Sequence, residues 1–179
     1  MITETLLRDG TRALIWPLLP GDREELRQRY ETLSARTREH RFLANVPHLT
    51  DTMLDHLVDE VDGIDHVALA LVVIDEHDEG EAVGVARVIR YRERPDAADV
   101  AVTVEDAWQG RGVATALLAE LMRERPADVT RIVTTVAADN DASFAMLRRL
   151  GPTTVTPAGT NRLDVVVELP DAGCDRSGT

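Results

Sequence analysis

A junction rich in glycine connects a strand-like segment to a helix-like one. Residues 102–118 read VTVEDAWQGRGVATALL, so a valine pattern gives way to Gln-Gly-Arg-Gly and then to an apolar helical stripe. The first turn of a helix carries unpaired N–H groups and a partial positive charge, and glycines let a ligand approach the backbone closely. The junction is therefore suited to binding an anion such as a phosphate, with Arg111 as a charged donor. A tight turn with an exposed arginine is the alternative.

Other phosphate-binding loops do not match this spacing. The chain contains no GxxxxGK[ST], which excludes a P-loop. It also lacks a GxGxxG followed by a suitably placed acid, which argues against a dinucleotide-binding fold.

The elements that must position this junction are those of an α/β domain with a mixed sheet. Apolar runs and turn residues predict strands at 13–18, 66–74, 82–90, 99–104 and 131–136, with a closing hairpin at 155 and 163–169. Helical spacing predicts helices at 22–35, 50–61, 113 up to Pro126, and 140–150. We expect 36–49 to be irregular and 93–97 to be a turn. Antiparallel strands come first in this order, and a right-handed crossover follows.

Two sequence motifs resemble those of the Gcn5-related N-acetyltransferases, the GNAT superfamily. Gln109, Gly112 and Ala114 match the family's pyrophosphate loop, (Q/R)xxGx(G/A). The stretch NDASFAMLRRLG is similar to the family's next motif, Nxx(S/A)xxx(L/Y)x(K/R)xG, at Asn140, Ser143, Leu147, Arg149 and Gly151. The element order fits the family over about 10–169.

The resemblance implies the GNAT fold and acetyl-CoA as co-substrate, without a metal. This fold has a mixed, mostly antiparallel central sheet flanked by helices, whose fourth and fifth strands (here 99–104 and 131–136) splay apart. The pyrophosphate would lie on N–H groups of the junction, and the pantetheine arm would pair with the fourth strand. Asn140 would contact the pantetheine, and a helix N-cap is a compatible second role for it. The implied cofactor-binding residues are Val102, Thr103, Val104, Gln109, Gly110, Arg111, Gly112, Val113, Ala114, Thr115, Asn140 and Ser143.

The resemblance also points to carboxylates as candidate catalytic groups. An amine acceptor must lose a proton before it attacks a thioester, and a nearby carboxylate can take that proton. Family enzymes that acylate lysines often place a glutamate where this chain has Asp99, whose shorter side chain favours a bridging water. Glu105, at the strand's end, is the second candidate. The alternative for Asp99 is an acid at the strand edge that closes a turn, and the alternative for Glu105 is a solvated turn residue. The family's usual tyrosine acid is replaced by Leu147.

Residues 36–49 and the strand after them resemble the GNAT domain of bacterial protein lysine acetyltransferases (Pat-like), which modify acyl-CoA synthetases. This likeness implies a lysine-bearing protein as amine acceptor. A small-molecule amine acetyltransferase stays open, and so does an acyl-CoA-binding module without turnover. Many of those enzymes carry a regulatory domain, for which we expect no room here.

Composition limits the remaining possibilities. We expect one domain over 1–179, with an ordered core at about 10–169 and a flexible tail at 170–179. A net charge of −12 argues against nucleic-acid binding, and no apolar run is long enough to cross a membrane. The single cysteine, Cys174, and the lack of a signal peptide favour the cytoplasm. We expect a monomer or a weak homodimer. All 20 basic residues are arginine, so the chain has no lysine side chain to acylate.

Overall fold

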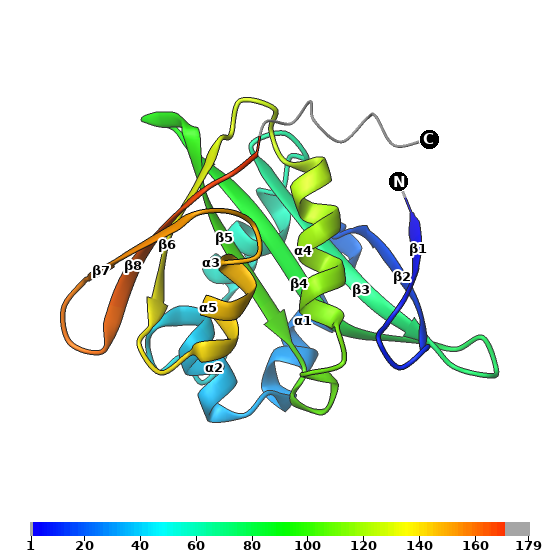
Figure 1. Cartoon of the computed structure of the whole chain (residues 1–179). Helices are drawn as coiled ribbons and strands as arrows, with labels where there is room; N and C mark the ends of the chain where they lie inside the picture. The colour runs from blue at the N-terminus through cyan, green and yellow to red at the C-terminus, as the bar shows by residue number, and fades with distance from the viewer. Residues whose placement is uncertain (1, 171–179) are drawn as a thin grey trace, which may run out of the picture.

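One eight-stranded sheet organises the chain (Figure 1). The computed structural model describes residues 2–170, so all of the tail expected at 170–179 except Pro170, Cys174 included, lies outside it. The strand order is β1-β2-β3-β4-β5-β6-β8-β7, and only β5 and β6 run parallel. This confirms the mixed, mostly antiparallel sheet. The strands are β1 Thr3–Leu6, β2 Arg12–Pro17, β3 His66–Ile74, β4 Gly80–Tyr91, β5 Arg94–Val104, β6 Arg131–Ala137, β7 Thr153–Pro157 and β8 Arg162–Glu168.

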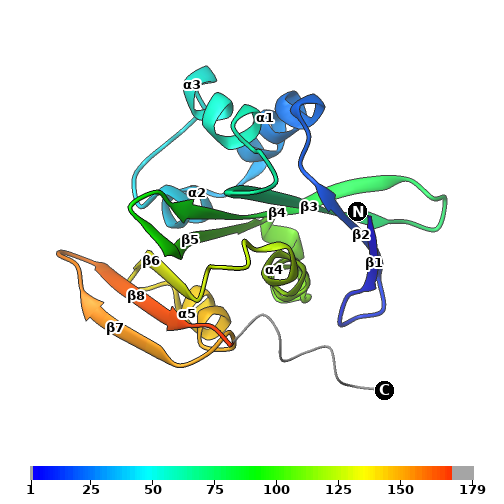
Figure 2. The same ribbon diagram turned by 90° about the horizontal axis from the view of Figure 1, so that it is seen from above.

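Helices cover both faces of this sheet, as Figure 2 shows. Alternate side chains of β3 belong to two cores: Val67 and Leu69 pack with α4, and Ala68 and Ala70 pack with the helices of the other face. The helices are α1 Arg23–Thr32, α2 Ala35–Phe42, α3 Asp51–Leu54, α4 Val113–Glu124 and α5 Asp141–Leu147, and α3 continues into a π-helical turn at Asp55–Asp59.

The sheet opens between β5 and β6. These strands pair only at Ala97–Arg131 and Ala98–Ile132, and then diverge. β6 instead pairs along its whole length with β8, which draws it away from β5. This confirms the expected splay, and it leaves the edge of β5 beyond residue 98 without a neighbouring strand.

The sequence-based prediction was wrong about helix α2, because it treated residues 36–49 as irregular. The Ser34 side chain caps α2 by accepting from the backbone N–H of Thr37, and Leu43 ends it in a left-handed conformation with φ 54°. Asp106 anchors the same end, because its carboxylate accepts from the Ser34 N–H and the Thr37 hydroxyl. This anchor lies far away in the sequence, so local pattern alone misses the helix.

Two strand boundaries also differ from the prediction. β1 was missed because its four residues gain their hydrogen bonds only by pairing with β2, so the fold starts before residue 10. β5 begins at Arg94, within the segment predicted to be a turn, because a bulge at Tyr91 allows a tighter reversal. Asp99 consequently lies in the middle of β5.

His66 makes the stability of the fold depend on pH. Burial, with a smaller effect of the neighbouring Arg87 cation, lowers the pKa of His66 to about 4 from an ordinary 6.5. Between these two pKa values the unfolded chain therefore binds a proton at His66 that the folded chain does not bind. With respect to this group, the folded state keeps its full stability above pH 6.5 and loses stability as the pH falls toward 4. We expect a loss of up to about 3 kcal/mol in the free energy of unfolding from this group.

Urea unfolding of the parent and of His66→Gln between pH 4 and 7 tests this expectation. The variant should lose less stability than the parent as the pH falls. His48→Gln is the control, because the His48 side chain is 72% exposed. If all three proteins had parallel pH profiles, the buried histidine would not be the source.

Candidate active site

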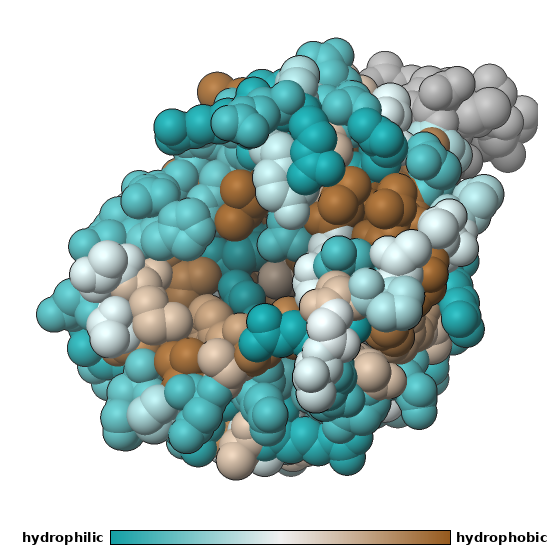
Figure 3. Space-filling model, turned by 90° about the vertical axis from the view of Figure 1, so that its left-hand side faces the viewer, coloured by the Kyte–Doolittle hydropathy of each residue, from teal (hydrophilic) through white to brown (hydrophobic). Residues whose placement is uncertain are grey.

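A groove runs along the open edge of β5 and ends at the glycine junction. It encloses about 1600 Å³ of empty space, part of which is open solvent. The surface seen from the side of β7 and β8 is hollowed, with polar and apolar side chains in its walls (Figure 3). The structure brings together in this groove every predicted cofactor-binding residue except Arg111: Val102, Thr103, Val104, Gln109, Gly110, Gly112, Val113, Ala114, Thr115, Asn140 and Ser143.

The junction has the backbone geometry that its glycines allow. Gly110 and Gly112 have φ of +76° and +100°, a region that residues with a Cβ rarely adopt. Gly112 is the N-cap of α4, and its carbonyl accepts the first helical hydrogen bond, from Ala116. The N–H groups of residues 113–115 therefore have no acceptor within the helix. They lie at the groove with the positive end of the helix dipole, as an anion cradle requires.

Arg111 is directed to the N-terminal hairpin instead of the groove. Its Nε donates to Asp9 Oδ2 at 2.6 Å, and its guanidinium carbon lies 3.8 Å from the centre of the Trp108 ring. Its carbonyl accepts from the backbone N–H of Arg8. The side chain thus fastens the β1–β2 hairpin to the junction, which differs from the predicted role as a phosphate donor.

Sequence reasoning missed Arg8, which lines the groove from that hairpin. Its guanidinium lies 3.5 Å from the Thr115 hydroxyl, in the first turn of α4. Arg36 and Arg149 are further cations of the groove wall. No local motif could have indicated Arg8, since only the pairing of β1 with β2 brings it there.

Asn140 caps α5. Its side-chain oxygen accepts from the backbone N–H of Ser143 at 3.1 Å. The N-cap role is therefore confirmed, and the residue still lines the groove. Leu147, at the position of the family's tyrosine, is 1% exposed and belongs to the core. Its side chain has no proton to give to a leaving thiolate.

Asp99 is half-buried on β5, on the same strand face as Ala101 and Thr103. Burial raises the pKa of Asp99, although a hydrogen bond from Thr134 and the positive charge of Arg41 both oppose this rise. A raised pKa makes a carboxylate a stronger base, which suits a general base. Asp99 lines neither the groove nor the cavity described below, and it remains a candidate catalytic residue through its place on the strand face that leads to Thr103.

Glu105 is held in a network of ion pairs. Arg29 Nη1 lies 3.2 Å from Glu105 and 3.1 Å from Glu81, and its Nε lies 3.7 Å from Glu25. Burial raises the pKa of Glu105 and the charge of Arg29 lowers it. Because its carboxylate is already paired with a cation, this geometry favours a structural role for Glu105 over proton transfer.

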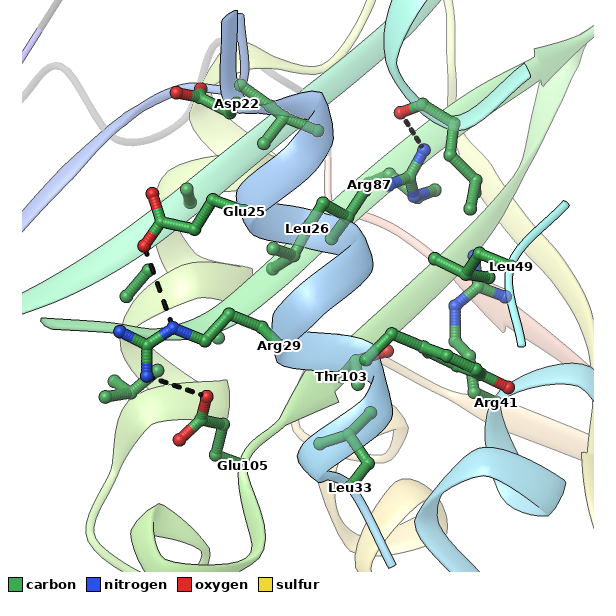
Figure 4. A pocket seen from close by; sticks show the side chains of 18 of the residues that line it. Asp22, Glu25, Leu26, Arg29, Leu33, Arg41, Leu49, Arg87, Thr103 and Glu105 are labelled. Atoms are coloured by element: carbon green, nitrogen blue, oxygen red, sulfur yellow. Dashed lines mark hydrogen bonds and ion pairs between the residues drawn. The ribbon is translucent and has the colours of Figure 1, made fainter. Parts of the chain in front are cut away.

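A second cavity lies on the face of the sheet covered by α1–α3 (Figure 4). It encloses about 840 Å³ of empty space, part of it open solvent, and most of its walls are apolar. Thr103 and Arg41 line both this cavity and the groove, so the two spaces meet there. The arrangement allows a donor in the groove and an acceptor in the cavity to approach each other beside β5.

Within residues 2–170, no three His, Cys, Asp or Glu side chains gather as a metal site requires. No helix in the same range is long and apolar enough to span a membrane.

Comparisons with known proteins identify the family. The model of the family described as "Acetyltransferase (GNAT) family" matches residues 32–151, and the chain therefore belongs to this family. The chain is 36% identical over 118 residues to acetyltransferase PA5475 of Pseudomonas aeruginosa, which covers 65% of this chain and 61% of that protein. It is 33% identical over 146 residues to acetyltransferase Pat of Mycolicibacterium smegmatis, which covers 81% of this chain and 42% of that protein.

A solved structure gives the same result. The crystal structure of the GNAT domain of S. lividans PAT has a TM-score of 0.80 and 28% identity, covering 94% of this chain and 97% of that one. The GNAT fold and the Pat-like resemblance are thereby confirmed. The chain spans less than two thirds of the length of both curated relatives.

Proposed function

We propose that this domain transfers an acetyl group from acetyl-CoA to a primary amine, by direct attack of the amine on the thioester. The observation that carries the proposal is the groove, in which the open edge of β5 leads to a glycine cradle and both GNAT motifs line the walls. The residues fit the cofactor, because Gly112 has a left-handed backbone conformation at the cradle, which a residue with a Cβ rarely adopts.

The chain's own residues supply binding, orientation and proton transfer. The N–H groups of Val113–Thr115 bind the pyrophosphate, and the free edge of β5 pairs with the pantetheine arm. A backbone N–H of β5 stabilises the negative charge that develops on the thioester oxygen. Asp99 takes the proton of the amine, directly or through a water.

A lysine side chain on another protein is the acceptor that we favour. The relatives Pat of M. smegmatis and PAT of S. lividans support it, since the chain resembles both. A small-molecule amine is the second candidate, because the cavity beside the groove is partly enclosed. A module that binds acyl-CoA without turnover is the third reading.

Release of free CoA thiol from acetyl-CoA separates these readings. One acceptor pool holds mixed small amines and the other holds lysine-bearing acyl-CoA synthetases. Release only with the proteins supports lysine acetylation, and release only with small amines supports the second candidate. If neither pool reacts although acetyl-CoA binds, the transfer proposal fails and the binding module replaces it. Because the chain itself contains no lysine, acetyl-lysine detected in the assay belongs to the acceptor.

Arg8→Ala is expected to weaken acetyl-CoA binding about tenfold, the effect of losing one charge-assisted contact. The loss should shrink at high salt, because salt screens an exposed charge. Calorimetry at low and high salt measures both effects. Arg12→Ala is the control, since Arg12 lies in the same hairpin and pairs with Asp78 outside the groove. Equal affinities of the two variants would exclude Arg8 from the site.

A further inference from the structure

Three arginines line the mostly apolar cavity beneath α1–α3: Arg29, which is ion-paired, and Arg41 and Arg87. Arg87 lies in the middle of β4 and is 4% exposed. Arg41 comes from the last turn of α2, and it also borders the groove. The side chains around them are largely hydrocarbon and aromatic: Trp16, Leu18, Leu26, Tyr30, Leu49 and Leu57. Figure 4 shows Arg41 and Arg87 on one side of α1, away from Arg29.

Neither guanidinium forms an ion pair among the residues that the structure describes. Arg87 Nη1 donates to the carbonyl of Leu57 at 2.7 Å and lies 3.3 Å from His66 Nε2. His66 is neutral near pH 7, since burial lowers its pKa to about 4. Within residues 2–170, no carboxylate comes within 4.0 Å of Arg41 or Arg87, whereas Arg29 at the other side of the cavity has three.

The remaining charges leave this part of the cavity positive. Asp99 acts on Arg41 from beyond ion-pair distance, and the charge of Arg41 in turn helps to lower the pKa of Arg87. Asp22, Glu25 and Glu105 line the cavity too, but Arg29 binds the two glutamates. Removing Arg41 and Arg87 from water is unfavourable, and the charges of Asp99 and Asp22, neither within ion-pair distance of them, compensate it only in part. An entering anion would therefore be stabilised.

We propose that the cavity receives a carboxylate group of a substrate, held by Arg41 and Arg87. Guanidinium groups match the planar geometry of a carboxylate, and the apolar walls suit the short carbon chain that would carry it. Because the cavity meets the groove at Arg41 and Thr103, this carboxylate has two possible sources. It ends the acyl chain of a dicarboxylic acyl-CoA, or it belongs to the amine acceptor. The inference rests on the proposed function, since it places acyl transfer in the adjoining groove.

The donor arm of the test compares succinyl-CoA with butyryl-CoA, which has the same chain length without the carboxylate. The acceptor arm compares free lysine with lysinamide, using acetyl-CoA as donor. We expect the carboxylate-bearing member of at least one pair to be favoured about tenfold or more, in dissociation constant for donors or kcat/KM for acceptors. Preference in the donor arm assigns the carboxylate to the acyl group, and preference in the acceptor arm assigns it to the amine.

Variants separate recognition from folding. Arg87→Gln and Arg41→Gln should each reduce the preference to near unity. Arg38→Gln should keep it, because Arg38 lies on the same helix as Arg41 but bonds the carbonyl of Pro47. If the role of Arg87 were only to bond Leu57, its variant would lower Tm and leave the preference intact, which would overturn its part in the proposal.

The parent protein alone decides the question if the variants fail to fold. No preference in either arm, with acetyl-CoA bound normally, overturns the carboxylate site and leaves the proposed function standing. Failure of acetyl-CoA to bind removes both.

Discussion

Asp99→Asn is expected to lower kcat by about 10²- to 10⁴-fold, the usual contribution of a general base. Asparagine has nearly the same shape but cannot take the proton that the acceptor's ammonium group must lose before the neutral amine attacks. Asp99 lies on β5 at some distance from the cradle, on the strand face that leads to Thr103, so acetyl-CoA affinity should change little. Calorimetry and steady-state kinetics on the same preparations measure the two quantities separately.

The pH profile distinguishes a base from a merely structural carboxylate. Burial raises the pKa of Asp99 above its ordinary 3.8, and the residue must be deprotonated to act. The parent therefore keeps its activity until the pH falls through that raised pKa. The variant depends on amine that is already neutral, which becomes tenfold scarcer with each unit below the pKa of the amine. The ratio of parent to variant rates should accordingly grow as the pH falls.

Asp96→Asn is the matched control for Asp99, because Asp96 lies on the same strand but forms an ion pair with Arg131 at 2.6 Å. It should keep near-parental kcat at every pH. A parent-to-Asp99→Asn ratio that stays constant across the pH range would remove Asp99 from the mechanism.

Gly112→Val is expected to weaken acetyl-CoA binding by at least about 100-fold. Valine is strongly disfavoured at a φ of +100°, so the first turn of α4 must change its backbone conformation. Its Cβ would also lie 3.0 Å from Cγ of Arg8, a contact tighter than most real ones. Both effects move the N–H groups that form the cradle. Titration with acetyl-CoA measures the loss.

Gly159→Val separates loss of the cradle from general strain. Gly159 has a φ of +108°, and no described atom lies within 4 Å of the place its Cβ would take. It belongs to the turn between β7 and β8, so the variant has a similar backbone cost far from the junction. It should lose stability and keep its affinity. If Gly112→Val bound acetyl-CoA as tightly as the parent, the junction would not be a phosphate cradle.

The parts of the fold that local pattern determines were predictable. The continuous apolar run of β3 matches its strand from His66 to Ile74, and the apolar stripe of α4 matches its helix. The glycine junction and the Asn140 cap were also found, since each depends on residues adjacent in the chain.

The parts that depend on distant partners were not predictable. Helix α2 has few apolar residues, and Asp106 anchors its first turn. Arg111 was predicted to bind a phosphate because its partner Asp9 lies in the β1–β2 hairpin, far away in the sequence. Glu105 looked available as a base because Arg29, which pairs with it, lies on a helix remote in sequence. In each case a tertiary contact decides which way a polar side chain points.

Because β5 and β6 diverge, bound acetyl-CoA would take the place of a neighbouring strand along the free edge of β5. Backbone amides that face this gap exchange their hydrogens with water when the groove is empty, whereas those bonded to β4 are shielded. Bound acetyl-CoA should slow exchange along residues 99–104 and leave the β3–β4 ladder unchanged. Deuterium uptake of this one strand would thus report occupancy without any label on the ligand, and it would do so even in a variant that no longer turns over.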